Sequence, residues 1–266
     1  MNQGDPKSDE CFILVKAQPH RSSKYFETVC CAGIGRDGKW RRQYPVPFRI
    51  LEDSRKFSRW NWIEYEFTRS EVDRRSESQK VDPESIKPGR SLSRTERAKF
   101  INPLVRDSFD DADSRGESLT ILRPQSIELS WSEKSEHEIS SERAKHADLA
   151  NQLSLFGQTA KPLEPCPVQF KVKWKDSLGK IRNHECDDWE TSTAFNRFER
   201  LYGRDRALKF IKEKYEDQYF EAGIVLAFST HSRRNVTYGT RNQWLLVGLI
   251  RLDYDGQGDL LLQQEL

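Results

Sequence analysis

The strictest pattern in the sequence is an alternation over residues 168–175, which read VQFKVKWK. Every second side chain is apolar, and three of the four side chains between them are lysines. Successive side chains of a β-strand point to opposite faces of the sheet, so the segment predicts a strand with one buried face and one basic face in solvent. A chain with such a strand has to build a sheet that is covered on one side only.

Shorter apolar segments predict further strands. The Asp37-Gly38 pair is typical of a tight β-hairpin, and the β-branched and aromatic residues around it favour two paired antiparallel strands. Pro45 and Pro47 end the second of these strands, because proline has no backbone N–H to donate to the ladder. Strands are expected at residues 12–15, 25–34, 40–46, 60–67, 119–129, 168–175, 181–189, 220–228, 243–252 and 259–262.

Helical spacing is confined to a few segments. Ser93 begins a Ser-x-x-Glu capping box ahead of a short helix that reaches Phe100. Residues 132–149 are charged, with Ala and Leu at intermittent helical spacing, which indicates a solvated helix or a linker. Residues 191–198 and 204–215 have the apolar spacing of two further helices. The sequence therefore predicts a β-rich α+β fold.

Length and composition indicate two modules. A chain of 266 residues is long for one ordinary domain, and residues 157–167 read GQTAKPLEPCP, a proline-rich stretch typical of a boundary. We expect a β module over residues 1–130, a charged helix and linker over residues 131–166, and an α+β module over residues 167–266.

Charge and cysteine content exclude several classes of protein. Lys and Arg number 44 against 42 Asp and Glu, so the net charge of +2 favours neither acidic nor basic partners, and any electrostatic function has to come from local clusters. Five cysteines without a Cys-x-x-Cys pair indicate neither a disulfide framework nor a zinc ribbon. The N-terminal sequence lacks a signal-peptide pattern, and no apolar run approaches the roughly 18 residues of a membrane span. A cytoplasmic protein without a membrane partner is expected.

Part of the first module resembles a known family. The string ETVCCAGIGRDGKWRRQYPVPFRIL, from Glu27 to Leu51, is similar to the N-terminal part of bacterial dual-OB-containing proteins, which are found beside mobile elements and phage-defence genes. DRRSES from Asp73 and PESI from Pro83 extend the resemblance, although the family has Arg-Pro-Glu-Ser at residues 75–78, where this chain reads RSES. The resemblance implies an OB-like barrel in the first module. For the second module it favours another OB-like barrel as an alternative to a mixed α+β fold.

Two groups of cations predict contact with nucleic acid. Cationic side chains bind phosphates, and unpaired bases stack on aromatic rings. Cationic and aromatic residues both gather around the early hairpin, where the rings are Trp40 and Tyr44. A second basic group lies in the predicted loop over residues 230–242. Alternatively, the rings belong to the core and the cations only solvate the surface. The predicted nucleic-acid-binding residues are Arg36, Lys39, Arg41, Arg42, Arg49, Arg233, Arg234 and Arg241.

A short string near the middle of the chain predicts a protein partner. Residues 152–156 read QLSLF, which resembles the docking peptide with which bacterial polymerases and repair factors bind the replicative sliding clamp. In that family the Gln hydrogen-bonds at the rim of the clamp, while the second Leu and the aromatic residue fill an apolar pocket. Alternatively, the apolar residues are ordinary core or helix-end residues. The resemblance assigns clamp contacts to Gln152, Leu153, Ser154, Leu155 and Phe156.

A third candidate site is a polar cluster near the start of the second module, made of His184, Cys186, Asp187, Asp188 and Glu190. His and carboxylates can hold a divalent metal ion or transfer protons, so the alternative prediction is a metal-dependent nuclease that uses His184, Asp188 and Glu190. Asp187 or Asp188 is also a natural N-cap for the helix that follows, with Glu190 in its first turn. Phosphate-loop, dinucleotide-binding and nucleophile-elbow motifs are absent from the sequence, so no cofactor of those kinds is expected.

Together these features predict a bacterial or phage-borne nucleic-acid-binding accessory protein of a phage-defence system or mobile element. It would bind DNA or RNA and be positioned on DNA through the sliding clamp. Two alternatives remain open at this point. One is the metal-dependent nuclease or nucleic-acid-modifying enzyme, and the other is a protein-interaction subunit of a larger complex.

Overall fold

The computed structural model describes residues 5–22, 26–71, 73–155, 162–230 and 244–254. The chain forms two compact units, each assembled from two separate stretches. The first unit comprises Met1–Ser91 and Ser132–Gln169, and the second comprises Leu92–Trp131 and Phe170–Leu266. The chain therefore passes between the units three times.

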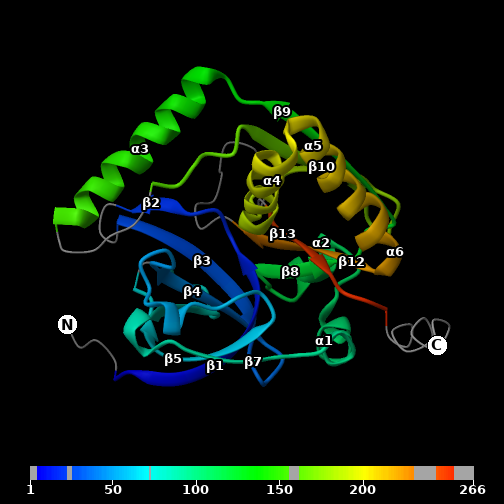
Figure 1. Ribbon diagram of the computed structural model, residues 1–266. Helices are drawn as coiled ribbons and strands as arrows, with labels where there is room; N and C mark the ends of the chain where they lie inside the picture. The colour runs from blue at the N-terminus through cyan, green and yellow to red at the C-terminus, as the bar shows by residue number, and fades with distance from the viewer. Residues whose placement is uncertain (1–4, 23–25, 72, 156–161, 231–243, 255–266) are drawn as a thin grey trace, which may run out of the picture. The chain divides into compact units, whose positions relative to one another are not determined.

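The first unit is built on a closed β-barrel, whose strands are blue to cyan in Figure 1. The barrel strands are β1 Lys7–Lys16, β3 Phe26–Ile34, β4 Trp40–Val46, β5 Asn61–Arg69 and β6 Ser78–Val81. They pair in the order β1-β3-β4-β6-β5, and β5 pairs with β1 to close the ring. Neighbours are antiparallel except β4 and β6, which are parallel.

This arrangement has the strand order of an OB-fold. When the five barrel strands are numbered along the chain, they follow one another around the ring as 1-2-3-5-4-1, which describes a five-stranded Greek-key barrel. The predicted OB-like barrel of the first module is therefore confirmed. The Asp37-Gly38 hairpin is confirmed as well, since it joins β3 to β4 with Gly38 at a φ of 74°.

Strand β1 is buried on both faces over its central residues, from Cys11 to Val15. One face lines the barrel interior. On the other face the Phe12 ring packs against Trp60 and Trp62, with centroids 5.8 and 5.4 Å away. Burial on both faces explains why this segment reads as a continuous apolar run instead of an alternation.

The other elements of the first unit lie outside the ring. Strand β2 His20–Ser22 pairs with β3, and β7 Lys87–Ser91 pairs with β5. Helix α3 Glu136–Leu155 contacts β3, where His146 Nδ1 lies 3.6 Å from Glu27 Oε2. Two short 3-10 turns complete the unit, η1 Asp53–Arg55 and η2 Pro83–Ser85.

The second unit carries helices α4 Trp189–Tyr202 and α5 Arg204–Glu213, followed by a π-helical turn η4 Lys214–Tyr219 and α6 Phe220–Ala222. Its shorter helices are α1 Arg94–Ile101, η3 Asn102–Leu104 and α2 Phe109–Ser114. Its strands are β8 Leu119–Leu122, β9 Ser126–Glu133, β10 Val168–Lys175, β11 Ile181–Glu185, β12 Ile224–Thr230 and β13 Trp244–Arg251. Residues 220–222, predicted as strand, are thus helical, because the helix that precedes them continues to Ala222.

The strand order of the first barrel is repeated in the second unit. The ladders β11-β10-β9 and β13-β12-β8 form two three-stranded sheets, and β8 and β9 follow each other closely enough to act as halves of one bent strand. A parallel bridge between Cys186 and Leu246 joins the end of β11 to β13. With β8 and β9 counted as one strand, the order is again 1-2-3-5-4, and α4 and α5 connect the third strand to the fourth. This agrees with the OB-like alternative for the second module.

Aromatic rings hold the two sheets of the second unit together. The strict alternation in β10 is confirmed, since its four apolar side chains are buried and its three lysines are exposed. Phe109 lies in the centre of this core. Its ring stacks on Trp244 with centroids 5.3 Å apart and meets Phe228 and Trp174 edge to face at 4.8 and 5.8 Å. Such edge-to-face and stacked pairs add to the free energy gained by burying the rings.

The expected division into residues 1–130, 131–166 and 167–266 differs from the one observed. Residues 92–131 belong to the second unit, because β8 pairs with β12 about a hundred residues later in the chain. Residues 132–169 belong to the first unit and contain the expected charged helix as α3. Composition shows local boundaries but not pairing between distant strands. The strand predicted at residues 259–262 lies outside the described residues.

Closure of the first barrel depends on a close approach at Gly33, which gives a testable prediction. A Cβ atom on Gly33 would lie 2.1 Å from the Phe12 carbonyl oxygen and 2.7 Å from Cys11 Sγ. We therefore expect Gly33→Ala to lower the free energy of unfolding by about 2 kcal/mol or more, as overpacking does. Urea denaturation measures this change. Gly89→Ala is the control, because its added Cβ comes no closer than 3.3 Å to any atom; equal losses in both variants would contradict the prediction.

Candidate functional site

Four of the five cations predicted around the early hairpin are held by carboxylates. Lys39 is exposed and makes no ion pair within the described residues. A guanidinium bound to a carboxylate offers a phosphate little net charge, so these contacts remove the reason for assigning the four arginines to phosphate. The ion pairs are Arg36–Glu10 at 2.7 Å, Arg41–Asp9 at 2.6 Å, Arg42–Glu77 at 3.5 Å and Arg49–Glu27 at 2.8 Å.

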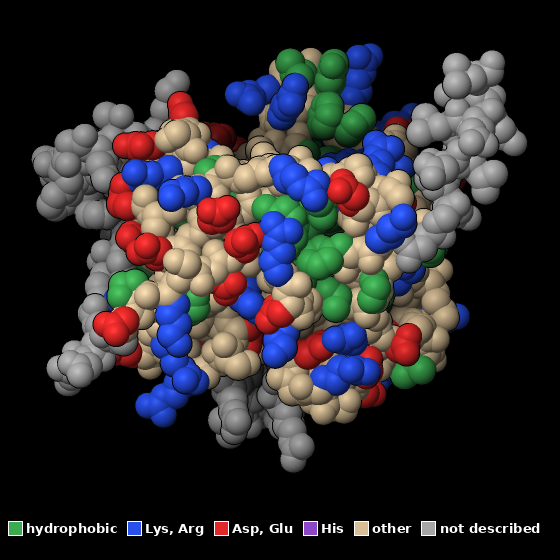
Figure 2. Space-filling view, turned by 90° about the horizontal axis from the view of Figure 1, so that it is seen from below, with side chains coloured by type: hydrophobic (Ala, Val, Ile, Leu, Met, Phe, Trp, Pro, Cys, Tyr) green, Lys and Arg blue, Asp and Glu red, His purple; other side chains and the backbone are tan. Residues whose placement is uncertain are grey.

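The same mixture of charges extends over the surface. Figure 2 shows Lys and Arg side chains next to Asp and Glu side chains over the described part of one face of the molecule. This agrees with a chain whose 44 cations are nearly balanced by 42 carboxylates. A surface that attracts phosphate therefore has to be identified from cations that lack a carboxylate partner.

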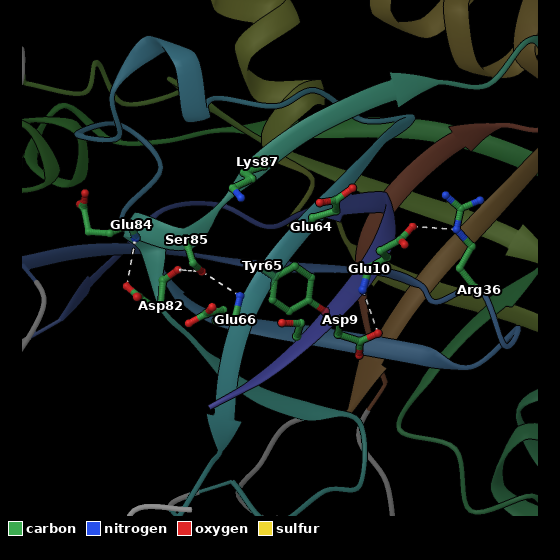
Figure 3. A pocket seen from close by; sticks show the side chains of 11 residues that line it. Asp9, Glu10, Arg36, Glu64, Tyr65, Glu66, Asp82, Glu84, Ser85 and Lys87 are labelled. Carbon is green, nitrogen blue, oxygen red and sulfur yellow. Dashed lines mark hydrogen bonds and ion pairs between the residues drawn. The ribbon is translucent and has the colours of Figure 1, made fainter. Parts of the chain in front are cut away.

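A pocket of about 630 Å³ lies over the outer face of β1 and β5 in the first unit (Figure 3). Arg36 donates from Nε to Glu10, and Ser85 accepts a hydrogen bond from the Glu66 backbone N–H. Carboxylates outnumber cations, so this side of the barrel repels a phosphate backbone. The charged residues that line the pocket are Asp9, Glu10, Glu64, Glu66, Asp82, Glu84, Arg36 and Lys87.

The outer face of β3, β4 and β6 has a different composition. In OB-folds the second and third strands form the face that binds oligonucleotides or oligosaccharides, together with the loops that join strands 1 to 2 and 4 to 5. In this barrel those strands are β3 and β4. Tyr44 on β4 is 43% exposed, and it pairs in register with Lys80 on the neighbouring strand β6. An accessible ring therefore lies beside a cation on this face.

The loop that joins β5 to β6, residues 70–77, is tied to the same face. Burial alone would raise the pKa of Asp73, but hydrogen bonds from Arg75 and Ser78 outweigh it and lower the pKa to about 2. The Ser78 hydroxyl donates to Asp73 Oδ2 at 2.8 Å, and Ser78 pairs in register with Arg42. The loop is thereby anchored to the strands by charge-assisted hydrogen bonds.

Two cations on this face make no ion pair with the described part of the chain. Arg74 lies in the 70–77 loop and is exposed, and Lys80 lies on β6 and is half-buried. Arg69, at the end of β5, pairs in register with the buried Gln79 and so points to the other side of the sheet. We call Tyr44, Arg74 and Lys80 the barrel face. A ring beside uncompensated cations can bind both the base and the phosphate of a nucleotide.

Only part of this face is predicted from the sequence. Tyr44 is a predicted ring near the hairpin, and Arg74 lies in the DRRSES string, but no sequence pattern assigns Arg74 or Lys80 to a binding surface. The signal for Lys80 is the parallel pairing of β6 with β4, which puts Lys80 beside Tyr44. That pairing joins residues more than thirty positions apart and has no local sequence pattern.

His184 of the predicted nuclease cluster is part of the aromatic core. Its Nδ1 accepts a hydrogen bond from Trp174 Nε1 at 3.0 Å, and its ring lies 5.0 Å from Phe228 and 5.9 Å from Phe109. Burial, with a smaller contribution from the positive charge of Arg182, lowers the pKa of His184 to about 4. The imidazole is therefore neutral and packs as a core side chain at physiological pH.

Asp188 of the same cluster is a buried helix cap. Its carboxylate accepts hydrogen bonds from the backbone N–H of Glu190, the Thr191 hydroxyl and the backbone N–H of Leu249. The predicted N-cap role, with Glu190 in the first turn of α4, is thus confirmed. His184 and Asp188 bond to different partners, and the described residues contain no group of three or more His, Cys, Asp or Glu that could hold a metal ion. The geometry gives the nuclease alternative no support.

The other predicted contacts are only partly described. Gln152, Leu153, Ser154 and Leu155 form the last residues of α3, whereas Phe156 lies outside the described residues. The predicted cations Arg233, Arg234 and Arg241 also lie outside them. The clamp-docking peptide and the second basic group stay predictions.

The fold and the barrel face define a class: a β-rich α+β protein of two units with OB-type strand order. Residues 104–262 match the family described as a domain of unknown function (DUF8757), and residues 7–107 match one described as a domain of unknown function (DUF8758). Because the first match covers more than half of the chain, the protein belongs to the DUF8757 family. A comparison with curated proteins found no match.

Within the described residues, every helix is too short or too polar to cross a bilayer. This agrees with the sequence prediction that no apolar run is long enough.

The environment of His184 predicts a specific pH dependence. In the unfolded chain its pKa is near 6.5, whereas in the folded protein it is about 4. Between these values the unfolded state binds the additional proton, so stability falls as the pH drops from 6.5 to 4, by about 3 kcal/mol from this group. Urea titrations at several pH values measure the loss. His184→Gln keeps a hydrogen-bond acceptor for Trp174 and should remove this pH-dependent loss of stability. The control is His137→Gln, which changes an exposed histidine. If His184→Gln loses as much stability as the unmodified protein between pH 6.5 and 4, His184 is not the group responsible.

Proposed function

We propose that the first unit binds single-stranded nucleic acid on the barrel face. The observation that carries the proposal is an exposed ring, Tyr44 on β4, next to Lys80 on β6 and together with Arg74 in the β5–β6 loop; neither cation makes an ion pair within the described residues. Strand β4 and the β5–β6 loop are among the elements with which OB-folds bind ligands. The acidic pocket makes the outer face of β1 and β5 unsuited to phosphate.

Each group has a defined part in such binding. An unpaired base stacks on the Tyr44 ring, and this contact tolerates any base because every base has a π-face. Arg74 and Lys80 neutralise phosphates and release counterions, which makes the affinity fall with salt. An oligosaccharide, the other usual ligand of OB-folds, has no phosphate and gives these cations no partner.

In the cell this binding would serve an accessory role. The resemblance to dual-OB-containing proteins supports a place in phage defence or in a mobile element. The QLSLF string supports recruitment to DNA through the sliding clamp. Both parts of the proposal rest on sequence resemblance, and recruitment through the clamp is tested below.

Binding to the barrel face can be measured with fluorescently labelled 20-nucleotide dT and U oligonucleotides and a 20-base-pair duplex. Tyr44→Ala should weaken single-strand binding about tenfold, the order expected for loss of one base stack. The double variant Arg74→Ala/Lys80→Ala should reduce the slope of log affinity against log salt by about 1.4, because each single-strand phosphate contact contributes about 0.7.

The control variant also loses two positive charges, but in the second unit. Lys171→Ala/Lys175→Ala removes two exposed lysines from β10 in the second unit. If this control loses as much affinity as Arg74→Ala/Lys80→Ala, the attraction is a general effect of net charge and the barrel face is not the site. If the oligonucleotides do not bind at all, the proposal fails.

The clamp peptide is tested by pull-down with an immobilised bacterial sliding clamp. Leu155→Ala/Phe156→Ala should abolish recovery of the protein, because these two residues would fill the apolar pocket of the clamp. Ile139→Ala, near the start of the same helix, is the control and should be recovered normally. Equal recovery of all three forms would remove the clamp from the proposal.

A further inference from the structure

Three aromatic rings lie in contact on the outer side of the α4–α5 hairpin in the second unit. The Phe198 and Phe210 rings have centroids 3.9 Å apart, and Tyr202 lies 6.1 Å from Phe198 with an angle of 23° between the ring planes. The two helices meet at Gly203, whose φ of 82° lets the chain turn between them. The rings therefore form a short ladder that ends at Tyr202. We call Phe198, Leu201, Tyr202 and Phe210 the ring ladder.

The ring ladder is not explained by the core of the unit. The helices bury their other sides, through residues such as Phe195, Ala207 and Ile211. By contrast, Tyr202 is 56% exposed, Leu201 58% and Phe210 36%. Contiguous exposed apolar side chains on a soluble protein mark a binding surface more often than single ones do. A ligand for this surface is therefore expected.

The charge around the ring ladder is positive. Residues 197–213 contain six cations and three carboxylates, in a chain whose total net charge is only +2. Two of the carboxylates are engaged by cations of the same segment, since Glu199 pairs with Arg204 and Glu213 with Lys209. Arg197, Arg200 and Arg206 are exposed and make no ion pair within the described residues. The ligand should accordingly be an anion.

These features favour a nucleic acid over other occupants. A second copy of the same surface would bring like charges together, which is unfavourable. The central part of a protein interface is depleted in charge, whereas here exposed arginines lie on the same two helices as the rings, a combination that suits base stacking and phosphate neutralisation. The terminal ring, Tyr202, is parallel enough to Phe198 for a base to extend the ladder on its exposed side.

We infer that the ring ladder is a second base-stacking site, which binds an unpaired stretch of single-stranded nucleic acid independently of the barrel face. Bases stack on Tyr202 and Phe210, Leu201 contributes apolar contact, and Arg197, Arg200 and Arg206 bind the adjacent phosphates. The inference rests on the proposed function, since it assumes that the ligand class is the same. It differs from that proposal in the unit, the elements and the residues involved.

The experiment combines crosslinking with affinity measurements on the full chain. A 20-nucleotide oligo-U that contains 4-thiouridine is irradiated with the protein, and the crosslinked peptides are identified by mass spectrometry. Crosslinks are expected in residues 197–213 as well as in the barrel face. Tyr202→Ala should abolish the former and weaken oligo-U binding about tenfold, whereas Tyr202→Phe, which keeps the ring, should bind like the unmodified protein.

The outcomes separate the two proposals. Leu178→Ala, which removes a 69% exposed apolar side chain from the β10–β11 turn, is the control and should change neither readout. Crosslinks confined to the barrel face, with unchanged binding by Tyr202→Ala, overturn the ring ladder alone. Crosslinks confined to residues 197–213, with unchanged binding by Tyr44→Ala, overturn the barrel face alone.

Discussion

The first unit depends on the double pairing of strand β1. Its backbone bonds to β3 on one side and to β5 on the other, and only this second ladder turns an open sheet into a barrel. Strand β3 can lie close to Phe12 and Cys11 of β1 because Gly33 has no side chain. Closure removes exposed sheet edges, which are liable to pair with other chains. It also fixes which faces of β4 and β6 point outward, and so it positions Tyr44 and Lys80 next to each other. The barrel face therefore depends on closure of the barrel.

Internal ion pairing decides which surfaces remain available to a polyanion. The hairpin arginines looked suitable for phosphate, but Arg41 is bound by Asp9 and Arg49 by Glu27. In a chain with nearly equal numbers of cations and carboxylates, most charges find a partner within the protein. Ion pairs at the surface add little stability. Their larger effect here is to neutralise most of the barrel, so that attraction is confined to a few uncompensated cations. In the second unit, the α4–α5 hairpin carries exposed arginines that make no ion pair within the described residues.

Sequence patterns predicted local structure, but they could not predict pairing between residues far apart in the chain. The alternation in residues 168–175, the Asp37-Gly38 turn and the cap at Asp188 each involve neighbours in sequence, and each is found as expected. The ion pair between Arg41 and Asp9 joins residues 32 positions apart, so the spacing of cations alone could not show it. His184 illustrates the same limit, because its neutral state depends on rings contributed by Phe109 and Phe228. The sequence spacing of that cluster could not show that His184 packs among these rings.

The three crossings of the chain between the units have a consequence for how such a protein can change over evolution. Because each unit is interrupted by part of the other, a single recombination breakpoint cannot transfer either unit whole to another gene. A cut after Ser91 would carry the five barrel strands but leave behind α3, and with it the His146 imidazole that faces Glu27. A relative that keeps only one of the two units would have to replace the missing segment.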